Sequence, residues 1–311
     1  MRQKDLGRPH TPAEYVRIYL TGFAMGAADI VPGVSGGTIA FIGGIYTTLL
    51  NAIKSFDVKA LRLGIGLQFR ALFEHIPVRF LVTLLLGIGT AIFLLANALG
   101  QALEEAPTFV FAFFGGLIVA SIVAILPRMR WDVLHVIVFV VAAVFAFFLV
   151  GLNPLEDADH SLPVLFLSGM VAICAMILPG ISGSFILLIL GQYQFILGAV
   201  RSFDLLSVAA VGVGAVVGIL GFTRALSWLL KHYESITIAA LVGFMLGSLR
   251  KIWDESVAGL ELLTSFGIAE AALLVGLIVL GFLLVSVLDH IQSGENALLR
   301  HVWKTRGLDT V

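Results

Sequence analysis

The chain has 311 residues, of which 59% are hydrophobic and 13% are charged, and its net charge is −1. Its mean hydropathy is +1.04. Soluble domains carry about 25% charged residues, so this composition excludes a soluble globular protein and indicates an integral membrane protein. The single cysteine, Cys174, excludes an internal disulfide framework. The sequence has no basic nucleic-acid-binding patch and no metal-ligand spacing, so we expect no nucleic-acid partner, no metal and no cofactor.

Apolar stretches divide the chain into ten predicted helices, most of them close to the roughly 20 residues that span a bilayer. In chain order they cover 12–31, 34–52, 79–100, 108–126, 132–151, 162–178, 181–200, 207–231, 236–250 and 268–290. A long connector, 53–78, follows the second helix. A polar turn at 152–161 divides the chain into two halves, 1–155 and 156–311, which together form one transmembrane domain.

A Pro-Gly-x-Ser-Gly element occurs once in each half, inside a long apolar stretch, at 32–36 and at 179–183. Aligned without gaps, residues 29–57 and 176–204 share 14 identities in 29 positions. Proline lacks a backbone donor and glycine lacks a Cβ, so the pair breaks a helix and leaves backbone groups unpaired. In hydrocarbon such groups are tolerated only where protein or a polar cavity surrounds them. Broken helices at matching positions of two halves predict a transporter's substrate site.

Each half therefore has the same predicted plan, a helix pair broken at Pro-Gly followed by three ordinary helices. The half crosses the membrane three times if the broken pair re-enters, or five times if both arms span. Both counts are odd, so the second half must be inserted upside down relative to the first. We predict an all-α integral membrane protein built from two inverted-topology repeats. We favour re-entrant pairs, because inverted repeats place their sites near the midplane.

Charges in the predicted loops indicate the orientation of the chain. Basic residues cluster at 2–17, 54–79, 128–130, 231–232 and 300–306, and they alternate with acidic turns at 104–105 and 156–159. By the positive-inside rule, this pattern predicts a multi-pass protein with both termini in the cytoplasm. The basic pair at 250–251 is an exception to the pattern.

The two breaks offer a site for an anion. Free backbone N–H groups cluster where the second arm of each pair begins, and the positive end of a helix favours phosphate. Serine hydroxyls can donate to such a ligand, and glycines let it approach the backbone. The alternative is that these residues only cap and pack kinked helices. The candidate substrate-binding residues of the breaks are Pro32, Gly33, Ser35, Gly36, Gly37, Thr38, Pro179, Gly180, Ser182, Gly183 and Ser184.

Two charged residues inside apolar segments complete the candidate site. Asp29 precedes the first break, where the second copy has Met176. A carboxylate within the membrane suggests a proton carrier, so we assign Asp29 a coupling role, with a local cap or ion pair as the alternative. Arg224 is a candidate phosphate ligand because a guanidinium can bind phosphate bidentately. It lies close to Lys231, so it can also reach toward the interface.

These residues resemble a known family. The pattern Gly26-x-x-Asp29-x-x-Pro32-Gly33-Val34-Ser35-Gly36-Gly37-Thr38, followed by Pro179-Gly180-Ile181-Ser182-Gly183-Ser184-Phe185, is similar to that of the polyprenyl-phosphate translocases. The resemblance covers the length of the chain, the repeat layout and both motifs. It implies a bacterial inner-membrane carrier that returns undecaprenyl phosphate, the lipid carrier of cell-wall glycan synthesis, across the bilayer. The implied partners are this lipid phosphate and the surrounding membrane lipids.

Two other functions fit part of the pattern. Membrane phosphatases of the undecaprenyl-diphosphate type also have inverted repeats and a Pro-Gly-x-Ser break, but their motif continues with arginine where this chain has Gly36 and Gly183. No two carboxylates lie one helical turn apart within a predicted span, so hydrolysis lacks an acid/base pair. We therefore expect no enzyme activity. A transporter of a small soluble anion or metabolite is the second alternative.

Overall fold

The first helix begins and ends at residues that favour those positions. The computed structural model describes residues 9–31, 33–260 and 267–293. Helix α1 (Pro12–Ile30) opens with a capping box. The Glu14 N–H donates to Thr11 Oγ1 at 3.3 Å, and the Glu14 carboxylate accepts from the N–H groups of Thr11 and His10. The helix ends directly before the first Pro-Gly break, as the sequence predicts.

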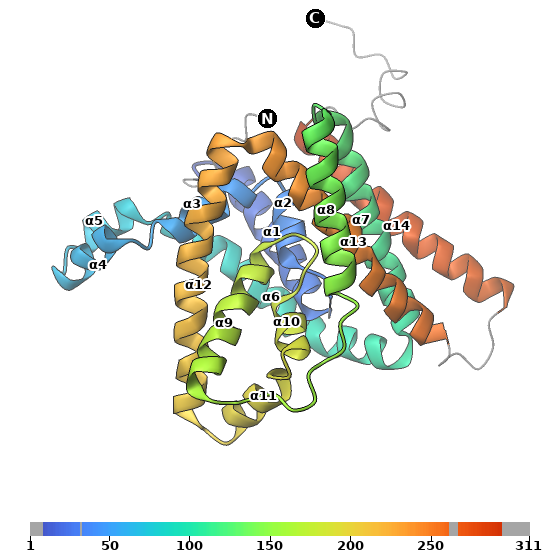
Figure 1. Cartoon of the computed structure of the whole chain (residues 1–311). Helices are drawn as coiled ribbons and strands as arrows, with labels where there is room; N and C mark the ends of the chain where they lie inside the picture. Colours follow the sequence, from blue (N-terminus) through green and yellow to red (C-terminus); the bar gives the residue numbers. More distant parts are fainter. Residues whose placement is uncertain (1–8, 32, 261–266, 294–311) are drawn as a thin grey trace, which may run out of the picture. The chain divides into compact units, whose positions relative to one another are not determined.

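All regular structure among the described residues is helical, and no strand occurs there (Figure 1). The first half contains α1, α2 (Gly36–Ile42), α3 (Tyr46–Lys54), α4 (Val58–Ile65), α5 (Phe69–His75), α6 (Val78–Glu105), α7 (Pro107–Ile125), a 3₁₀ turn (Leu126–Arg128) and α8 (Val133–Leu149). The second half contains α9 (Leu162–Ile177), α10 (Gly183–Ile189), α11 (Tyr193–Arg201), α12 (Leu205–His232), α13 (Glu234–Leu260) and α14 (Ile268–Ser293).

The two halves repeat the same order of elements. Helices α1, α2 and α3 end at residues that align with the ends of α9, α10 and α11, and α6 and α12 are both 28 residues long. The connector 53–78 holds α4 and α5, which have no counterpart in the second half. The inverted orientation of the halves remains a prediction.

The prediction of one continuous helix at 34–52 and another at 181–200 is wrong, because each segment forms two short helices. Helices α2 and α3 meet at 116°, and α10 and α11 meet at 105°. Gly44 and Gly191, which align with each other, both have φ of 66° at the bend. This left-handed conformation cannot continue a right-handed helix, and glycine adopts it without a steric penalty.

The chain packs as two compact units, which do not coincide with its two halves. Unit 1 comprises 1–41, 45–93 and 152–234, so it contains both Pro-Gly breaks together with α1, α9, α12 and the first part of α6. Unit 2 comprises 42–44, 94–151 and 235–311 and contains α7, α8, α13 and α14. Each unit therefore combines segments from both halves.

Unit 1 is built on two helix pairs that glycines bring into close contact. The Cα of Gly22 in α1 faces the backbone of Leu84 in α6, and Gly87 in α6 faces the backbone of Tyr19 in α1. A Cβ at either glycine would collide with the partner's carbonyl oxygen, so only glycine permits this approach. The aligned contacts recur between α9 and α12, as Gly169 with Val211 and Gly214 with Phe166.

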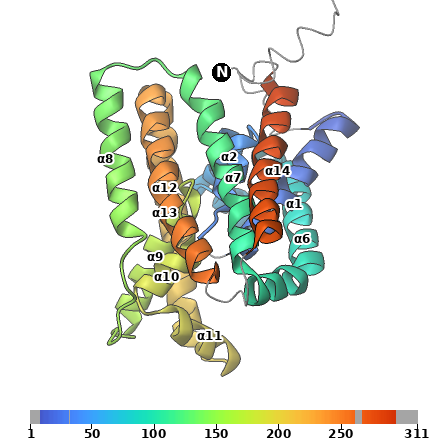
Figure 2. The same cartoon turned by 90° about the vertical axis from the view of Figure 1, so that its right-hand side faces the viewer.

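Unit 2 uses the same glycine packing, but its pairs join one half of the chain to the other. Gly116 of α7 lies against the carbonyl of Ile278 in α14, and Figure 2 shows these two helices side by side. Gly243 of α13, which aligns with Gly116, lies against the carbonyl of Phe139 in α8. The pair α7–α14 is therefore the repeat equivalent of the pair α13–α8.

Five described helices are long and apolar enough to cross a membrane, so this is a multi-pass membrane protein. They are α6, α7 with its 3₁₀ turn, α12, α13 and α14 up to His290. The two bent pairs would raise the number to seven if each formed one span. Length and composition do not decide whether a bent pair spans or re-enters, so re-entry stays a prediction.

Candidate functional site

The two Pro-Gly breaks lie together in unit 1 and are joined by hydrogen bonds. The Gly180 N–H of the second break donates to Thr38 Oγ1 at 2.8 Å. The Ser35 hydroxyl of the first break donates to the carbonyl oxygens of Met176, at 3.3 Å, and Leu178, at 3.4 Å. Ser35 and Thr38 are fully buried. Side chains of the first break thus satisfy backbone groups that the second break leaves without helical partners.

Tyr46 adds a third connection between the breaks. Its hydroxyl donates to the Ile177 carbonyl at 3.0 Å, and its ring is buried at 1% exposure with an edge contact to Phe41. Tyr46 is not one of the site residues predicted from the sequence. The signal was available, because Tyr46 aligns with Tyr193 inside the repeated segment.

The first break carries a carboxyl group of its own. Asp29 Oδ1 accepts the Gly36 N–H at 2.7 Å, and the Gly37 N–H donates to Ser35 Oγ at 3.1 Å. A Cβ at Gly36 would lie 2.5 Å from Asp29 Oδ2, so a larger residue there would displace the Asp29 side chain from its present position. The side chain of Asp29 therefore caps α2, which is the local role that the sequence analysis gives as the alternative to coupling.

The second break has no carboxylate, because Met176 takes the place of Asp29. Ser182 stands at the N-cap of α10, yet its side chain makes no capping hydrogen bond. Its hydroxyl lies 2.7 Å from that of Ser184, which is exposed. The second break therefore presents a pair of hydroxyls beside the first turn of α10.

Glycine and proline shape both breaks. Gly33 has φ of 81° and the aligned Gly180 has φ of 94°, so each chain reverses through a conformation that favours glycine. Pro179 is buried, whereas Pro32 lies outside the described residues. A Cβ at Gly37 would lie 2.9 Å from the Ile177 carbonyl oxygen, and one at Gly183 would lie 2.8 Å from that of Ala172. These two glycines therefore also serve close packing.

Arg224 does not join the breaks. One guanidinium nitrogen donates to the Leu220 carbonyl of its own helix at 2.6 Å, and the other donates to the Phe56 carbonyl at 3.4 Å. Phe56 follows the end of α3, so Arg224 ties α12 to the segment that leads into α4. No hydrogen bond links it to a described residue of either break.

The polar groups of the two breaks are hydroxyls, backbone amides and one carboxyl group, that of Asp29. No group of three or more His, Cys, Asp or Glu side chains that could hold a metal ion occurs among the described residues. Hydroxyls and amide N–H groups donate hydrogen bonds, so the arrangement suits an anionic oxygen ligand.

Comparison with known proteins identifies the family. Residues 25–269 match the family described as VCA0040-like, undecaprenyl phosphate translocase-like. The chain is 46% identical to a polyprenyl-phosphate transporter of Vibrio cholerae over 240 residues. The matched segment covers 77% of this chain and 78% of the relative. It is also 32% identical to a polyprenyl-phosphate transporter of Staphylococcus aureus over 249 residues. That segment covers 74% of this chain and 83% of the relative. No solved structure matches.

The family and both relatives bear the names of transporters, so the comparison indicates a transporter rather than an enzyme. This excludes the phosphatase alternative of the sequence analysis and agrees with the absence of the phosphatase arginine at Gly36 and Gly183. The resemblance seen in the sequence motifs is confirmed. The chain belongs to the undecaprenyl phosphate translocase-like family.

Proposed function

We propose that this protein is a flippase that carries polyprenyl phosphate, in the form of undecaprenyl phosphate, across the bacterial inner membrane. The lipid would thereby be recycled for cell-wall glycan synthesis. Membership of the translocase-like family supports this proposal, as do two relatives named as polyprenyl-phosphate transporters. A transporter of a small soluble anion remains the alternative to be tested against it.

The observation that carries the proposal is the pair of hydrogen-bonded breaks in unit 1. A lipid phosphate brings anionic oxygens into low dielectric, where they require donors. The second break offers the hydroxyls of Ser182 and Ser184, and it has Met176 in the position of Asp29. The phosphate would therefore bind on the side of the second break.

The remaining residues of the breaks would hold the backbone of this site in place. Gly33, Ser35, Gly36, Gly37 and Thr38 shape the first break, while Pro179, Gly180 and Gly183 shape the second, and Pro32 completes the first motif. Arg224 would act at the end of α3, where it bonds the Phe56 carbonyl, as a cation that a headgroup passes on its way to the breaks.

Asp29 would couple transport to protons. Its carboxylate holds the Gly36 N–H at 2.7 Å, so it is the negative charge that an arriving phosphate meets at the first break. Two anions close together in low dielectric repel each other, and a proton on one of them relieves the repulsion. Proton uptake by Asp29 would thus accompany phosphate binding, and proton loss would accompany release.

The proposed topology has two inverted repeats, 1–155 and 156–311, with re-entrant bent pairs and both termini in the cytoplasm. The order of elements repeats between the halves, and the basic loops alternate with acidic ones. In this arrangement the two breaks approach the midplane from opposite faces, so a headgroup bound between them is accessible from each leaflet in turn.

Reconstituted vesicles test the proposal. Purified protein is placed in liposomes that contain undecaprenyl phosphate, and the fraction of lipid phosphate in each leaflet is followed over time. The wild type should equilibrate the leaflets, and the double variant Ser182→Ala with Ser184→Ala should lose most of this activity. Ser202→Ala is the matched control, because that hydroxyl bonds only the end of α11.

Three outcomes would contradict the proposal. Uptake of free phosphate without movement of the lipid would favour the small-anion transporter. Release of phosphate from undecaprenyl diphosphate would restore the enzyme alternative. Equal lipid transport by the double variant and the Ser202→Ala control would show that the second break does not bind the headgroup.

A further inference from the structure

Helices α4 and α5 form a hairpin that only the first half possesses. In the second half, α11 ends at Arg201 and α12 begins at Leu205, with Asp204 as its N-cap. The aligned Asp57 also caps the next helix, because its Oδ1 accepts the Ala60 N–H at 2.9 Å, but that helix is α4. The hairpin is therefore inserted between α3 and α6 in the first half, and the second half has no equivalent.

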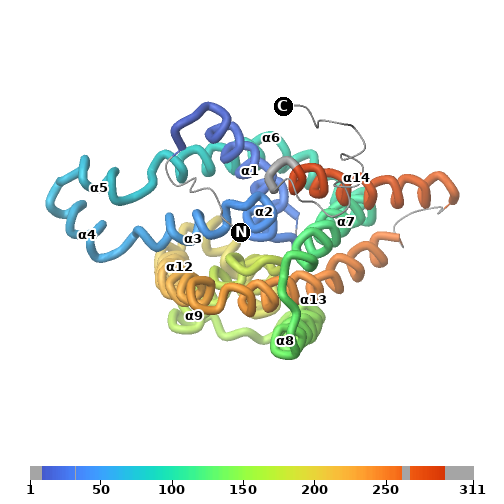
Figure 3. Tube along the Cα trace, turned by 90° about the horizontal axis from the view of Figure 1, so that it is seen from above, coloured from blue at the N-terminus to red at the C-terminus, as the bar shows by residue number. Residues whose placement is uncertain are grey.

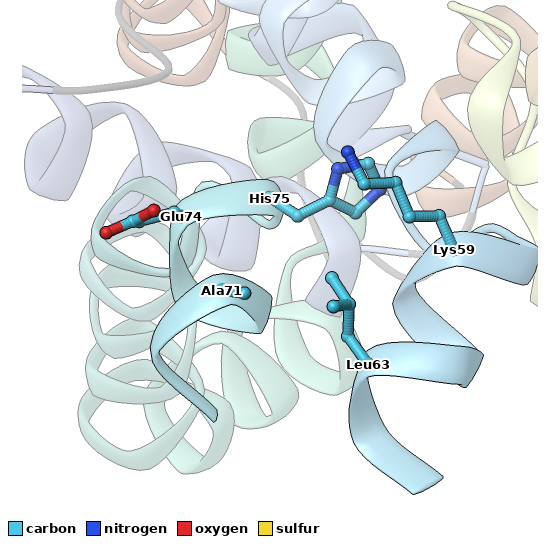
Figure 4. Close-up of a pocket in the computed structure, with 5 residues that line it drawn as sticks. All are labelled: Lys59, Leu63, Ala71, Glu74 and His75. Carbon is cyan, nitrogen blue, oxygen red and sulfur yellow. The ribbon is translucent and has the colours of Figure 1, made fainter. Parts of the chain in front are cut away.

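The base of the hairpin is closed. His75 Nε2, at the end of α5, lies 3.0 Å from Asp57 Oδ1. The Ala60 backbone N–H and the His75 ring together hold the pKa of Asp57 below its usual value. Lys59 and Leu63 of α4 line a cleft of about 520 Å³ together with Ala71, Glu74 and His75 of α5. In Figure 4 the Lys59 side chain lies toward His75, and the Glu74 carboxylate points away from α4. The two short helices thus form a defined element rather than a loose loop.

Large apolar side chains cover the outside of this hairpin. Val58, Leu61 and Ile65 follow the spacing of one face of α4, and Phe69 and Phe73 do the same on α5. Together with Leu67, which stands in the turn between the helices, they are 54–76% exposed. Leu67 has φ of 52°, where glycine or asparagine would be less strained, so the turn carries an apolar side chain at an energetic cost.

Basic side chains flank these apolar faces. Arg62 lies on α4 beside the apolar face, and Arg70 lies on α5 with 95% of its side chain exposed, in an ion pair with Glu74 at 3.4 Å. Figures 1 and 3 show the hairpin reaching away from α3 and α6, and no other described element of unit 1 covers it. A helix with an apolar face and flanking basic residues binds the boundary between the headgroups and acyl chains of anionic membranes.

We propose that α4 and α5 lie in the headgroup layer of one leaflet and bind the surface of an anionic bilayer. The apolar side chains enter the acyl boundary, and Arg62 and Arg70 contact lipid phosphates. Since the second half has no such hairpin, the anchoring acts on one face of the membrane only. The occupant of the exposed face is the lipid surface and not a second copy of the chain.

Site-directed labelling of the full-length protein tests this placement. In a Cys174→Ala background, a spin label is attached at Leu61→Cys or Phe73→Cys, and at Glu74→Cys as the control on the charged face of α5. Nanodiscs that hold a single protomer are prepared from phosphatidylcholine alone or with phosphatidylglycerol added. Collisions with lipid-soluble oxygen and with a water-soluble nickel complex measure the immersion of each label.

In phosphatidylglycerol discs, labels at Leu61 and Phe73 should meet oxygen and not nickel, and the label at Glu74 should do the opposite. Each basic residue near an anionic surface contributes roughly a fivefold factor to binding, so an Arg62→Gln, Arg70→Gln variant should lower the ratio of immersed to free hairpin on the order of 25-fold. That variant should then behave alike in both kinds of disc.

Either of two results would overturn the proposal. In the first, the nickel complex reaches Leu61 and Phe73 as readily as Glu74 in phosphatidylglycerol discs. In the second, protection of Leu61 and Phe73 occurs only in discs that hold two protomers, which would assign the face to a second copy.

Discussion

Replacing Tyr46 with phenylalanine removes a single hydroxyl group that connects the two breaks. The ring stays in its buried site, so no cavity forms, and the loss is confined to the 3.0 Å hydrogen bond with the Ile177 carbonyl. That carbonyl ends α9 and has no helical partner. A buried carbonyl left unsatisfied costs about 1–3 kcal/mol, and hydrogen bonds between membrane helices reach about 1.7 kcal/mol, so we expect Tyr46→Phe to destabilise the protein by about 1–2 kcal/mol.

The repeat supplies a matched control for this measurement. Tyr193 aligns with Tyr46, but its hydroxyl makes no hydrogen bond to another described residue, so Tyr193→Phe should cost less than about 0.5 kcal/mol. Reversible unfolding in mixed detergent–lipid micelles measures both variants, and the Tyr46→Phe midpoint should shift without a change of slope. Equal destabilisation by the two substitutions would refute the assignment of the hydrogen bond as a connection between the breaks.

Three further predictions concern coupling, topology and stability. Asp29→Asn should leave a folded protein that binds the lipid but no longer responds to a pH gradient in the vesicle assay; wild-type rate and pH dependence would remove Asp29 from the mechanism. Single cysteines at Lys54 and Arg201 should be labelled by impermeant reagents from opposite sides of the membrane, and labelling from the same side would exclude inverted repeats. Asp289→Asn should destabilise unit 2 by about 3 kcal/mol, because it breaks a bidentate pair with Arg128 at 2.7–2.9 Å. The double variant Arg128→Met with Asp289→Leu should regain most of this stability, as measured by thermal unfolding. If the double variant instead lost the sum of the two single-variant losses, the pairing would be contradicted.

The positions of the breaks could be predicted because their signal is local. Proline and glycine end α1 and α9 where the sequence places them, through missing donors and positive φ. The bends at Gly44 and Gly191 were missed for a physical reason. A glycine inside an apolar helical pattern costs only about 1 kcal/mol, so its presence alone does not distinguish a tolerated glycine from a turn.

The hydrogen bonds of the site could not be predicted, because they join segments far apart in the chain. Nothing local to Thr38 indicates that its hydroxyl accepts the Gly180 N–H. Asp29 was recognised as unusual by its place in an apolar segment, but its bond to Gly36 depends on how sharply the chain turns at the break. Arg224 shows the opposite case. Its charge suggests a place at the breaks, but its long-range hydrogen bond goes to the Phe56 carbonyl.

The crossed pairing of unit 2 sets an order for biogenesis. Helix α7 leaves the ribosome long before its glycine-packed partner α14, and α8 likewise precedes α13. At ribosomal rates of about 5–20 residues per second, the wait of α7 is on the order of ten seconds. During this time Gly116 presents an open groove to lipid or to other nascent helices. Insertion factors that shield such grooves would therefore matter more for this unit than for the α1–α6 pair, whose partners are made in close succession.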